Sequence, residues 1–274
     1  MTSSTEPSPA GPAVAGSGAR AATEATPAAR LSATILTTLV ASASLEEQPT
    51  PWARLTAPGS SDPVGSVRWF RDGGGTDRGI HSVVAISLVV PAFGLDSHMV
   101  FAFGAPDAPL PHFTLDSVQA GGGYAFHLDL VPRVDLAVNP AYADGVYAPL
   151  TGSFARASEI PGLAPAAISP RQRSLMSPWM LVHRADEAAL GAITPVAEHY
   201  LEHWLALTRS FPADAAREAE EGDAPARDRK LREALFSREI DPVWSQVDRL
   251  LGTATTDRLR RLLVTGTPDE AVAV

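Results

Sequence analysis

The chain has 274 residues, of which 31 are acidic and 22 basic, so its formal net charge at neutral pH is −9. This charge argues against general nucleic-acid affinity, because contact with a phosphate backbone requires a basic face. The sequence has no cysteine, which excludes disulfides, thiolate nucleophiles, zinc–thiolate sites and cysteine-bound iron–sulfur clusters. A redox function would therefore depend on electrons supplied from outside the chain.

The two ends of the chain differ from its middle. Residues 1–30 are rich in Pro, Ala, Ser, Thr and Gly, so they are expected to be a disordered tail that cannot offset the entropy of ordering. One domain is expected over residues 31–266, with a flexible end over residues 267–274.

The tail has no secretion-signal pattern, and no run reaches the ~18 apolar residues of a membrane span. A cytoplasmic protein without membrane contact is therefore expected. Lys230 is the only lysine, and this preference for arginine over lysine indicates a GC-rich bacterial genome.

The first half of the folded region predicts one helix followed by a sheet. Leu31–Ser44 has apolar residues at helical spacing, and a loop rich in Pro, Gly and Ser follows to about Pro63. Five strand-like segments come next, joined by short links rich in Gly, Asp or Pro: Ser66–Arg71, Ser82–Val90, His98–Phe103, His112–Gln119 and Tyr124–Leu130. Because no helix separates these strands, they are expected to pair as an antiparallel meander.

After Pro140 the sequence is mainly helical. Tyr142–Ala157 is expected to be helical, and Leu175–His183 is expected to form a last strand. The later helices are predicted over Pro195–Thr208, Arg229–Arg238, Asp241–Leu251 and Thr256–Val264. Helices on both sides of a central antiparallel sheet predict an α/β protein with a three-layer α/β/α sandwich.

A short motif, H-Y-L-E-H, lies in the Pro195–Thr208 helix. It places His199 and His203 one turn apart, with Glu202 beside them, which is the pattern of the inverted zinc peptidases. Five residues match such a pattern easily by chance, and the next helix offers acids only at generic positions. A polar flank beside an apolar stripe is therefore the favoured interpretation, and a zinc hydrolase is an alternative.

Other enzyme classes leave motifs that this sequence does not contain. It has no G-x-S-x-G elbow, no Walker loop and no dinucleotide fingerprint. Nicotinamide and flavin cofactors therefore have no recognisable binding loop.

Polar residues in the two last meander strands are the remaining candidates for chemistry. Period-two alternation puts Asp116 on one face of its strand, and puts His127 and Asp129 together on one face of the next. Burial of these groups is costly unless they are paired or line a pocket, and in a pocket the pKa of a carboxyl is raised towards neutrality, as a proton donor requires. A solvated face, or a pair between Asp129 and Arg133, is the alternative interpretation.

The stretch that contains these residues resembles a known family. HLDLVPRVDLAVNPAY is similar to the L-D-L-P-x-R-x-D-L-x-x-x-P-x-Y signature of red chlorophyll catabolite reductase, in the ferredoxin-dependent bilin reductase superfamily. PHFTLDSVQ precedes it, LMSPWML follows like the S-P-T strand of that family, and ITPVAEHYLEHWL resembles its S-P-x-A-x-x-x-L-x-x-W-L helix. The resemblance covers about Gly65 to Leu263, and it makes the H-Y-L-E-H motif part of an ordinary family helix.

The resemblance implies a fold and an activity. The fold is an α/β/α sandwich with the substrate held between the sheet and the C-terminal helices. The activity is reduction of a linear tetrapyrrole without a bound metal or organic cofactor, in which reduced ferredoxin supplies single electrons and side chains supply protons. A non-catalytic pigment-binding protein of the same fold is the main alternative.

The resemblance also implies catalytic residues. Asp116 takes the position of a family Glu in the sheet beside the catalytic pocket, with a side chain shorter by about 1.5 Å. Asp241 lies at, or one residue from, the second acid of the family, although from the local sequence it is equally the N-cap of a helix. His127, Asp129 and Arg133 are candidates for substrate binding, and Arg133 for bidentate contact with a propionate.

Ferredoxins are acidic, so an enzyme that is acidic overall needs a local basic surface to bind one. One candidate surface consists of Arg171, Arg173 and Arg184, and the other of Arg227, Arg229, Lys230 and Arg232.

Overall fold

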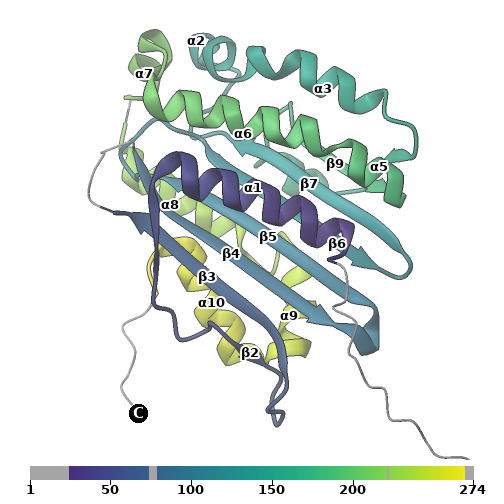
Figure 1. Cartoon of the computed structure of the whole chain (residues 1–274). Helices are drawn as coiled ribbons and strands as arrows, with labels where there is room; N and C mark the ends of the chain where they lie inside the picture. Colours follow the sequence, from purple (N-terminus) through teal and green to yellow (C-terminus); the bar gives the residue numbers. More distant parts are fainter. Residues whose placement is uncertain (1–24, 74–78, 221, 269–274) are drawn as a thin grey trace, which may run out of the picture.

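The computed structural model describes residues 25–73, 79–220 and 222–268. They form three layers, in which a single antiparallel sheet lies between two groups of helices (Figure 1). The predicted α/β/α sandwich is therefore confirmed. The predicted tails, apart from residues 25–30 and 267–268, lie outside the described residues.

The sheet has nine strands in the order β1-β3-β4-β5-β6-β7-β9-β8, and β2 pairs with β3 off this path. The strands are β1 Leu45–Gln48, β2 Leu55–Thr56, β3 Pro63–Asp72, β4 Ile80–Val90, β5 Leu95–Gly104, β6 His112–Ala120, β7 Gly123–Val131, β8 Leu163–Pro165 and β9 Leu181–Ala185. Strands β3 to β7 are neighbours in both sequence and space, as the meander prediction requires. β1 and β2 lie in the segment predicted as a loop, where short, polar strands carry little periodicity.

Helices cover both faces of this sheet. On one face lie α1 Pro27–Ala43, α3 Thr151–Ser158, α5 Glu187–Ala192 and α6 Thr194–Arg209, and on the other lie α8 Ala224–Leu235, α9 Val243–Leu251 and α10 Thr253–Thr265 (Figure 1). The shorter helices are α2 Pro140–Tyr142, α4 Pro170–Arg173 and α7 Ala213–Ala219, together with the single turns η1 Pro91–Phe93, η2 Ala143–Tyr147 and η3 Ala148–Leu150. No described helix is both long enough and apolar enough to cross a membrane.

Alternation along the strands divides the buried side chains into two cores. Phe113 and Leu128 belong to the core under α1 and α6, where Phe113 packs against Trp204 with ring centroids 6.2 Å apart. Phe101 and Val131 belong to the second core, under α8, α9 and α10. Asp116 and His127 lie on the face of this second core, because their strand neighbours Leu115 and Leu128 occupy the first.

Several boundaries differ from the sequence prediction; α8, for example, spans Ala224–Leu235 where a helix over Arg229–Arg238 is predicted. Of the predicted last strand, Leu175–His183, only Leu181–His183 lies in a strand, because the preceding residues turn at Pro178 while Asp129 accepts a hydrogen bond from Ser177. The helix predicted over Tyr142–Ala157 is divided into α2, η2, η3 and α3, and Pro149, which has no N–H, lies in this division. α1 begins at Pro27, so the predicted tail includes its first turn, which Thr26 caps.

Candidate active site

A cavity of about 1070 Å³ lies between the sheet and the second helical layer. Met99, Phe101 and Val118 form part of its wall on the sheet, and Phe236 and Trp244 form part of the opposite wall. The lining is largely apolar, with only a few ionisable groups. This combination is typical of sites for large organic ligands.

Asp116 projects into this cavity from the middle of β6. Its neighbours across the sheet are Met99 on β5 and His127 on β7. The side chain retains 40% exposure, and because Asp116 lines the cavity, we assign this exposed part to the cavity. Burial, and to a lesser degree the charge of Asp241, raises the pKa of Asp116 to about 7. A substantial fraction of this carboxyl is therefore protonated near neutral pH.

His127 is an ionisable neighbour of Asp116, paired with it across β6 and β7. Its Nδ1 lies 3.9 Å from Asp116 Oδ2, which is too long for a hydrogen bond. Burial lowers the pKa of His127 to about 4, so the imidazole is neutral at physiological pH. His127 Nε2 and Asp116 Oδ1 are both buried and have no hydrogen-bond partner among the described residues. Unpaired buried polar atoms are costly, and here the two groups form a polar spot in a largely apolar wall.

Asp241 lies between α8 and α9 and also lines the cavity. Its Oδ1 accepts a hydrogen bond of 3.0 Å from the backbone N–H of Val243 and one of 3.5 Å from Gln172 Nε2. Burial raises the pKa of Asp241. The carboxyl group therefore bonds to the first residue of α9 from the position before the N-cap residue Pro242, rather than from the N-cap position that the local sequence indicates, and Asp241 is at the same time a wall residue of the cavity that contains Asp116.

Asp129 does not line the cavity, although it lies two residues from His127. It is fully buried, and its carboxylate accepts hydrogen bonds from the backbone N–H of Ser177 at 2.9 Å and from Ser177 Oγ at 2.5 Å. Burial raises the pKa of Asp129 to about 7 despite these bonds. In this arrangement Asp129 holds the turn before β9.

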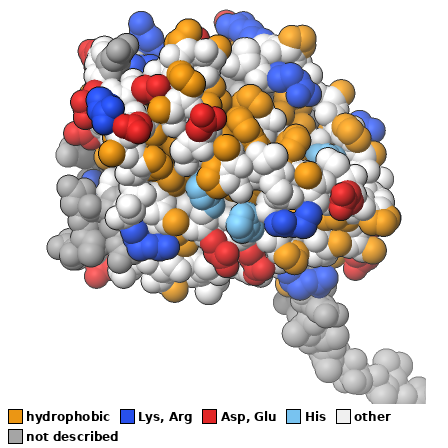
Figure 2. All heavy atoms as spheres, turned by 90° about the horizontal axis from the view of Figure 1, so that it is seen from above, with side chains coloured by type: hydrophobic (Ala, Val, Ile, Leu, Met, Phe, Trp, Pro, Cys, Tyr) orange, Lys and Arg blue, Asp and Glu red, His pale blue; other side chains and the backbone are white. Residues whose placement is uncertain are grey.

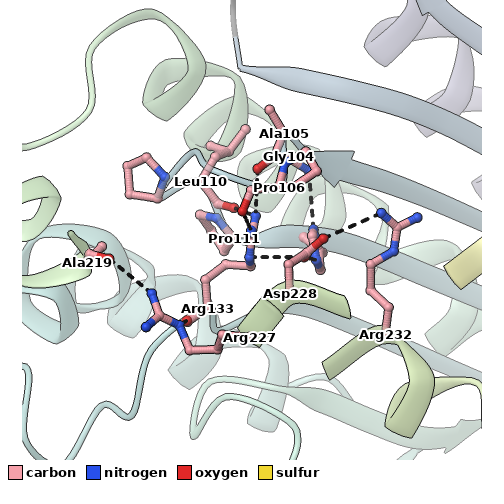
Figure 3. Close-up of polar contacts among 12 residues, drawn as sticks. Gly104, Ala105, Pro106, Leu110, Pro111, Arg133, Ala219, Arg227, Asp228 and Arg232 are labelled. Carbon is pink, nitrogen blue, oxygen red and sulfur yellow. Dashed lines mark hydrogen bonds and ion pairs between the residues drawn. The ribbon is translucent and has the colours of Figure 1, made fainter. Parts of the chain in front are cut away.

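Arg133 also lies outside the cavity lining, and it makes no ion pair with Asp129. Its guanidinium donates to the carbonyl oxygens of Ala105, Pro106 and Leu110, and its Nε lies 3.2 Å from Asp228 Oδ1 (Figure 3). These contacts occupy the guanidinium inside the protein. The guanidinium of Arg133 therefore lies against the backbone and α8. In the described structure it does not reach a ligand in the cavity.

Arg133 is part of a buried ionic network that sequence analysis missed. His112 Nε2 donates to Asp228 Oδ1 at 2.8 Å, while His112 Nδ1 accepts from the N–H of Gly104 at 3.2 Å. Arg232 stacks over the Phe103 ring at 3.8 Å and lies 3.8 Å from Asp228 Oδ2. The network fixes α8 to the sheet, and α8 ends at Leu235, which lines the cavity.

The pKa values in this network follow from burial and charge. Burial lowers the pKa of His112 to about 4, which keeps the ring neutral and lets Nδ1 accept from Gly104. Burial alone would raise the pKa of Asp228, but the hydrogen bond from His112 and the two guanidinium groups lower it overall. In this network the carboxylate of Asp228 therefore lies between the guanidinium groups of Arg133 and Arg232, and the neutral imidazole of His112 donates a hydrogen bond to it.

The two candidate basic surfaces differ in exposure. Arg171 and Arg173 are exposed on either side of the cavity residue Gln172, and Arg184 is exposed on β9. In the second set Arg232 is buried, and Arg227 donates to the carbonyl oxygens of Arg133 and Ala219. On the face seen from above, the described acidic, basic and hydrophobic side chains are interspersed (Figure 2).

The H-Y-L-E-H motif lies on α6, on the opposite side of the sheet from the cavity. His203 Nε2 is 2.7 Å from the carbonyl oxygen of Val146, a contact in which the ring nitrogen donates. Across residues 25–73, 79–220 and 222–268, no group of three His, Asp or Glu side chains is arranged to hold a metal ion.

Comparison with known proteins identifies the fold. No protein-family model matches this chain, and no curated protein sequence matches it. Among solved structures, phytochromobilin synthase from tomato, in complex with biliverdin, is similar with a TM-score of 0.65 and 17% sequence identity, over 86% of this chain and 82% of that chain. A likeness at this identity establishes a shared architecture.

Proposed function

We propose that this protein reduces a linear tetrapyrrole, or a comparable conjugated pigment, with electrons from ferredoxin and no bound cofactor of its own. The observation that carries the proposal is the large apolar cavity that holds two carboxyl groups, Asp116 and Asp241, both with raised pKa values. The shared fold with phytochromobilin synthase, a ferredoxin-dependent bilin reductase solved with biliverdin bound, supports it.

The size and lining of the cavity support a pigment substrate. Its volume of about 1070 Å³ lies at the upper end of the ~300–1,000 Å³ usual for small-molecule sites. Aromatic and aliphatic walls suit a flat conjugated guest, which buries a large apolar area on binding.

The proposed reaction consumes two electrons and two protons for each double bond. Two molecules of reduced ferredoxin are each oxidised by one electron, and one carbon–carbon double bond of the pigment becomes a single bond with one hydrogen added to each carbon. Protonated Asp116 gives one proton and Asp241 gives the other, and each carboxylate is then reprotonated from solvent. A raised pKa suits this role because the acid is protonated at the working pH.

Anaerobic incubation with reduced ferredoxin and a panel of linear tetrapyrroles, followed by visible absorption, tests the proposal. Loss of long-wavelength absorption that requires both the protein and ferredoxin is expected, because reduction shortens the conjugated system. A pigment that binds with no ferredoxin-dependent change in its spectrum would favour a non-catalytic binding protein. Wild-type protein that binds no pigment at all would contradict both functions.

A further inference from the structure

An exposed aromatic side chain, Phe93, lies at one end of the cavity. Among the described residues, the large hydrophobic side chains that are exposed are Val89, Phe93, Val138 and Val243, with exposed fractions of 38%, 77%, 73% and 40%. Phe93 and Val243 both line the cavity, whereas Val89 does not: it follows Leu88 on β4, and because Leu88 lines the cavity, alternation directs Val89 to the other face of the sheet. Scattered exposed hydrophobic side chains need no explanation, but an aromatic ring that is 77% exposed and also lines a cavity indicates a contact surface for a guest.

Burial along the cavity shows that this end is its mouth. Phe101, Thr114 and Phe236 line the inner end and are at most 6% exposed. Phe93 and Ala120 line the other end and are exposed. A guest therefore enters beside the tip of the β4–β5 hairpin.

A compact turn holds Phe93 in place. Pro91–Phe93 form the turn η1, and Gly94 ends it with a left-handed φ of 58° and a hydrogen bond of 3.0 Å to the carbonyl oxygen of Pro91. The proline restricts the first position of the turn, and the positive φ favours glycine at the last. The Phe93 ring is thus presented from a defined turn at the end of two long strands.

The number of residues along β5 gives the distance from this turn to Asp116. Asp116 is paired with Met99 on β5, and Leu95, at the hairpin end of β5, is four residues from Met99. At about 3.3 Å per residue, the hairpin end is ~13 Å from the row that contains Asp116, and the Phe93 turn lies beyond it. A guest that reaches from Asp116 to Phe93 must therefore be longer than two linked five-membered rings.

We propose that Phe93 is a substrate-positioning residue whose ring packs on the outer rings of a long, flat, conjugated guest that reaches Asp116 with its inner rings. The inference rests on the proposed function, and it adds a minimum length to the substrate class. Phe93 then selects four-ring pigments over two-ring fragments, because only the longer guest contacts both ends of the cavity.

The test measures pigment binding without an electron donor, by the absorption change of the pigment and by quenching of tryptophan fluorescence, which Trp244 in the wall makes sensitive to occupancy. Phe93→Ala is expected to weaken biliverdin binding about ten-fold, as loss of one stacking contact does, and to leave the affinity for a two-ring dipyrrinone unchanged. Phe93→Trp is expected to keep wild-type affinity for both. Val138→Ala removes an equally exposed side chain outside the cavity lining and is the matched control.

Three results would each contradict a different part of the proposal. Equal biliverdin affinity of Phe93→Ala and the wild type would overturn the role of Phe93 and leave the proposed function intact. Equal weakening for biliverdin and the dipyrrinone would overturn the length selection. A wild-type protein that binds neither pigment would contradict the proposed function itself.

Discussion

At the scale of single residues, the raised pKa of Asp116 and the lowered pKa of His127 suit the proton donation that we propose. The same loss of water raises the pKa of the acid to about 7 and lowers that of the imidazole to about 4. Desolvation disfavours the charged form of each group, so near pH 7 the imidazole is neutral and a substantial fraction of the carboxyl is protonated. A guest that displaces water from the cavity strengthens this effect on Asp116.

Turnover is expected to depend on pH through Asp116. The acid must be protonated to donate, so the rate of pigment reduction should fall as pH rises above about 7, approaching ten-fold per pH unit. Initial rates between pH 5.5 and 9 with saturating ferredoxin test this. A rate that stays constant up to pH 9 would remove Asp116 from the donor role.

Asp116→Asn is expected to stabilise the folded protein at pH 8. The folded-state pKa of Asp116 is raised from its ordinary 3.8 to about 7, so the ionised group opposes folding above pH 7, and this cost fades as pH falls from 7 towards 4. Urea unfolding should show a higher midpoint for the variant at pH 8 and a smaller difference at pH 5. Asp144→Asn, at an exposed acid on η2, is the control and should change neither midpoint. A larger gain at pH 5 than at pH 8 would contradict the assignment.

At the scale of elements, α8 is held to the sheet by buried charges as well as by the apolar contacts of Leu231 and Leu235. Asp228 meets Arg133, Arg232 and His112 in a site from which water is excluded. Removal of one member of such a group leaves uncompensated buried charge, which costs more than the intact network contributes. Because the connection from α8 to α9 holds Asp241, the network also sets the position of the second proposed acid.

Asp228→Asn is expected to destabilise the protein by about 3–5 kcal/mol, because two buried guanidinium groups lose their carboxylate. Asp214→Asn, which breaks an exposed ion pair with Arg217, is the control and should cost less than about 1 kcal/mol. Urea unfolding of both variants at pH 7.5 gives the comparison. Equal midpoints for the two variants would show that the network does not hold α8.

The stability contributed by His112 should be lost in acid. The folded-state pKa of His112 is lowered from 6.5 to about 4, so the folded state resists protonation, and stability present above pH 6.5 falls as pH drops from 6.5 towards 4. Asp116 and Asp129 act in the opposite direction over this range. Replacement of His112 by Gln, followed by unfolding at pH 7.5 and 5, should therefore show a smaller cost at pH 5 than at pH 7.5. A cost that grows on acidification would contradict a neutral His112.

The short helix α4 is the proposed contact for ferredoxin. Arg171 and Arg173 are exposed next to the cavity residue Gln172, and Arg171 has only a loose contact of 3.8 Å with exposed Glu239. The double variant Arg171→Glu, Arg173→Glu is expected to raise the KM for ferredoxin several-fold at low salt and to leave pigment affinity unchanged, since rim charges act mainly on association. Arg217→Glu on α7 is the matched control. An unchanged KM for ferredoxin would place the docking surface elsewhere.

At the scale of the whole molecule, the three layers could be predicted from local patterns in the sequence. The roles of the polar residues could not, because they depend on contacts between residues that are far apart in the sequence. The five meander strands and the helices α1, α6, α9 and α10 follow from periodicity and end signals, because both are local properties of the chain. Alternation also placed Asp116 on one face of its strand, and His127 with Asp129 on one face of the next, but that Asp116 and His127 share the cavity face follows only from the register of β6 and β7. That Asp241 lines the same cavity is a tertiary contact, and the resemblance suggested it where periodicity could not.

Other polar roles could not be predicted from the sequence. Asp129 has a hydrogen-bond partner 48 residues away, and His112 has one 116 residues away, so no local pattern distinguishes these groups from ligands of a substrate. Phe93 was missed for a different reason: an aromatic residue in a turn has meaning only when the cavity next to it is known.

The most direct test of the account is one anaerobic measurement on the wild type and Asp116→Asn, in which biliverdin is titrated first and reduced ferredoxin is added afterwards. The account predicts similar biliverdin affinity for both proteins, with reduction at least about 100-fold slower in the variant, because an amide cannot donate the proton. Reduction by Asp116→Asn at the wild-type rate would contradict the account.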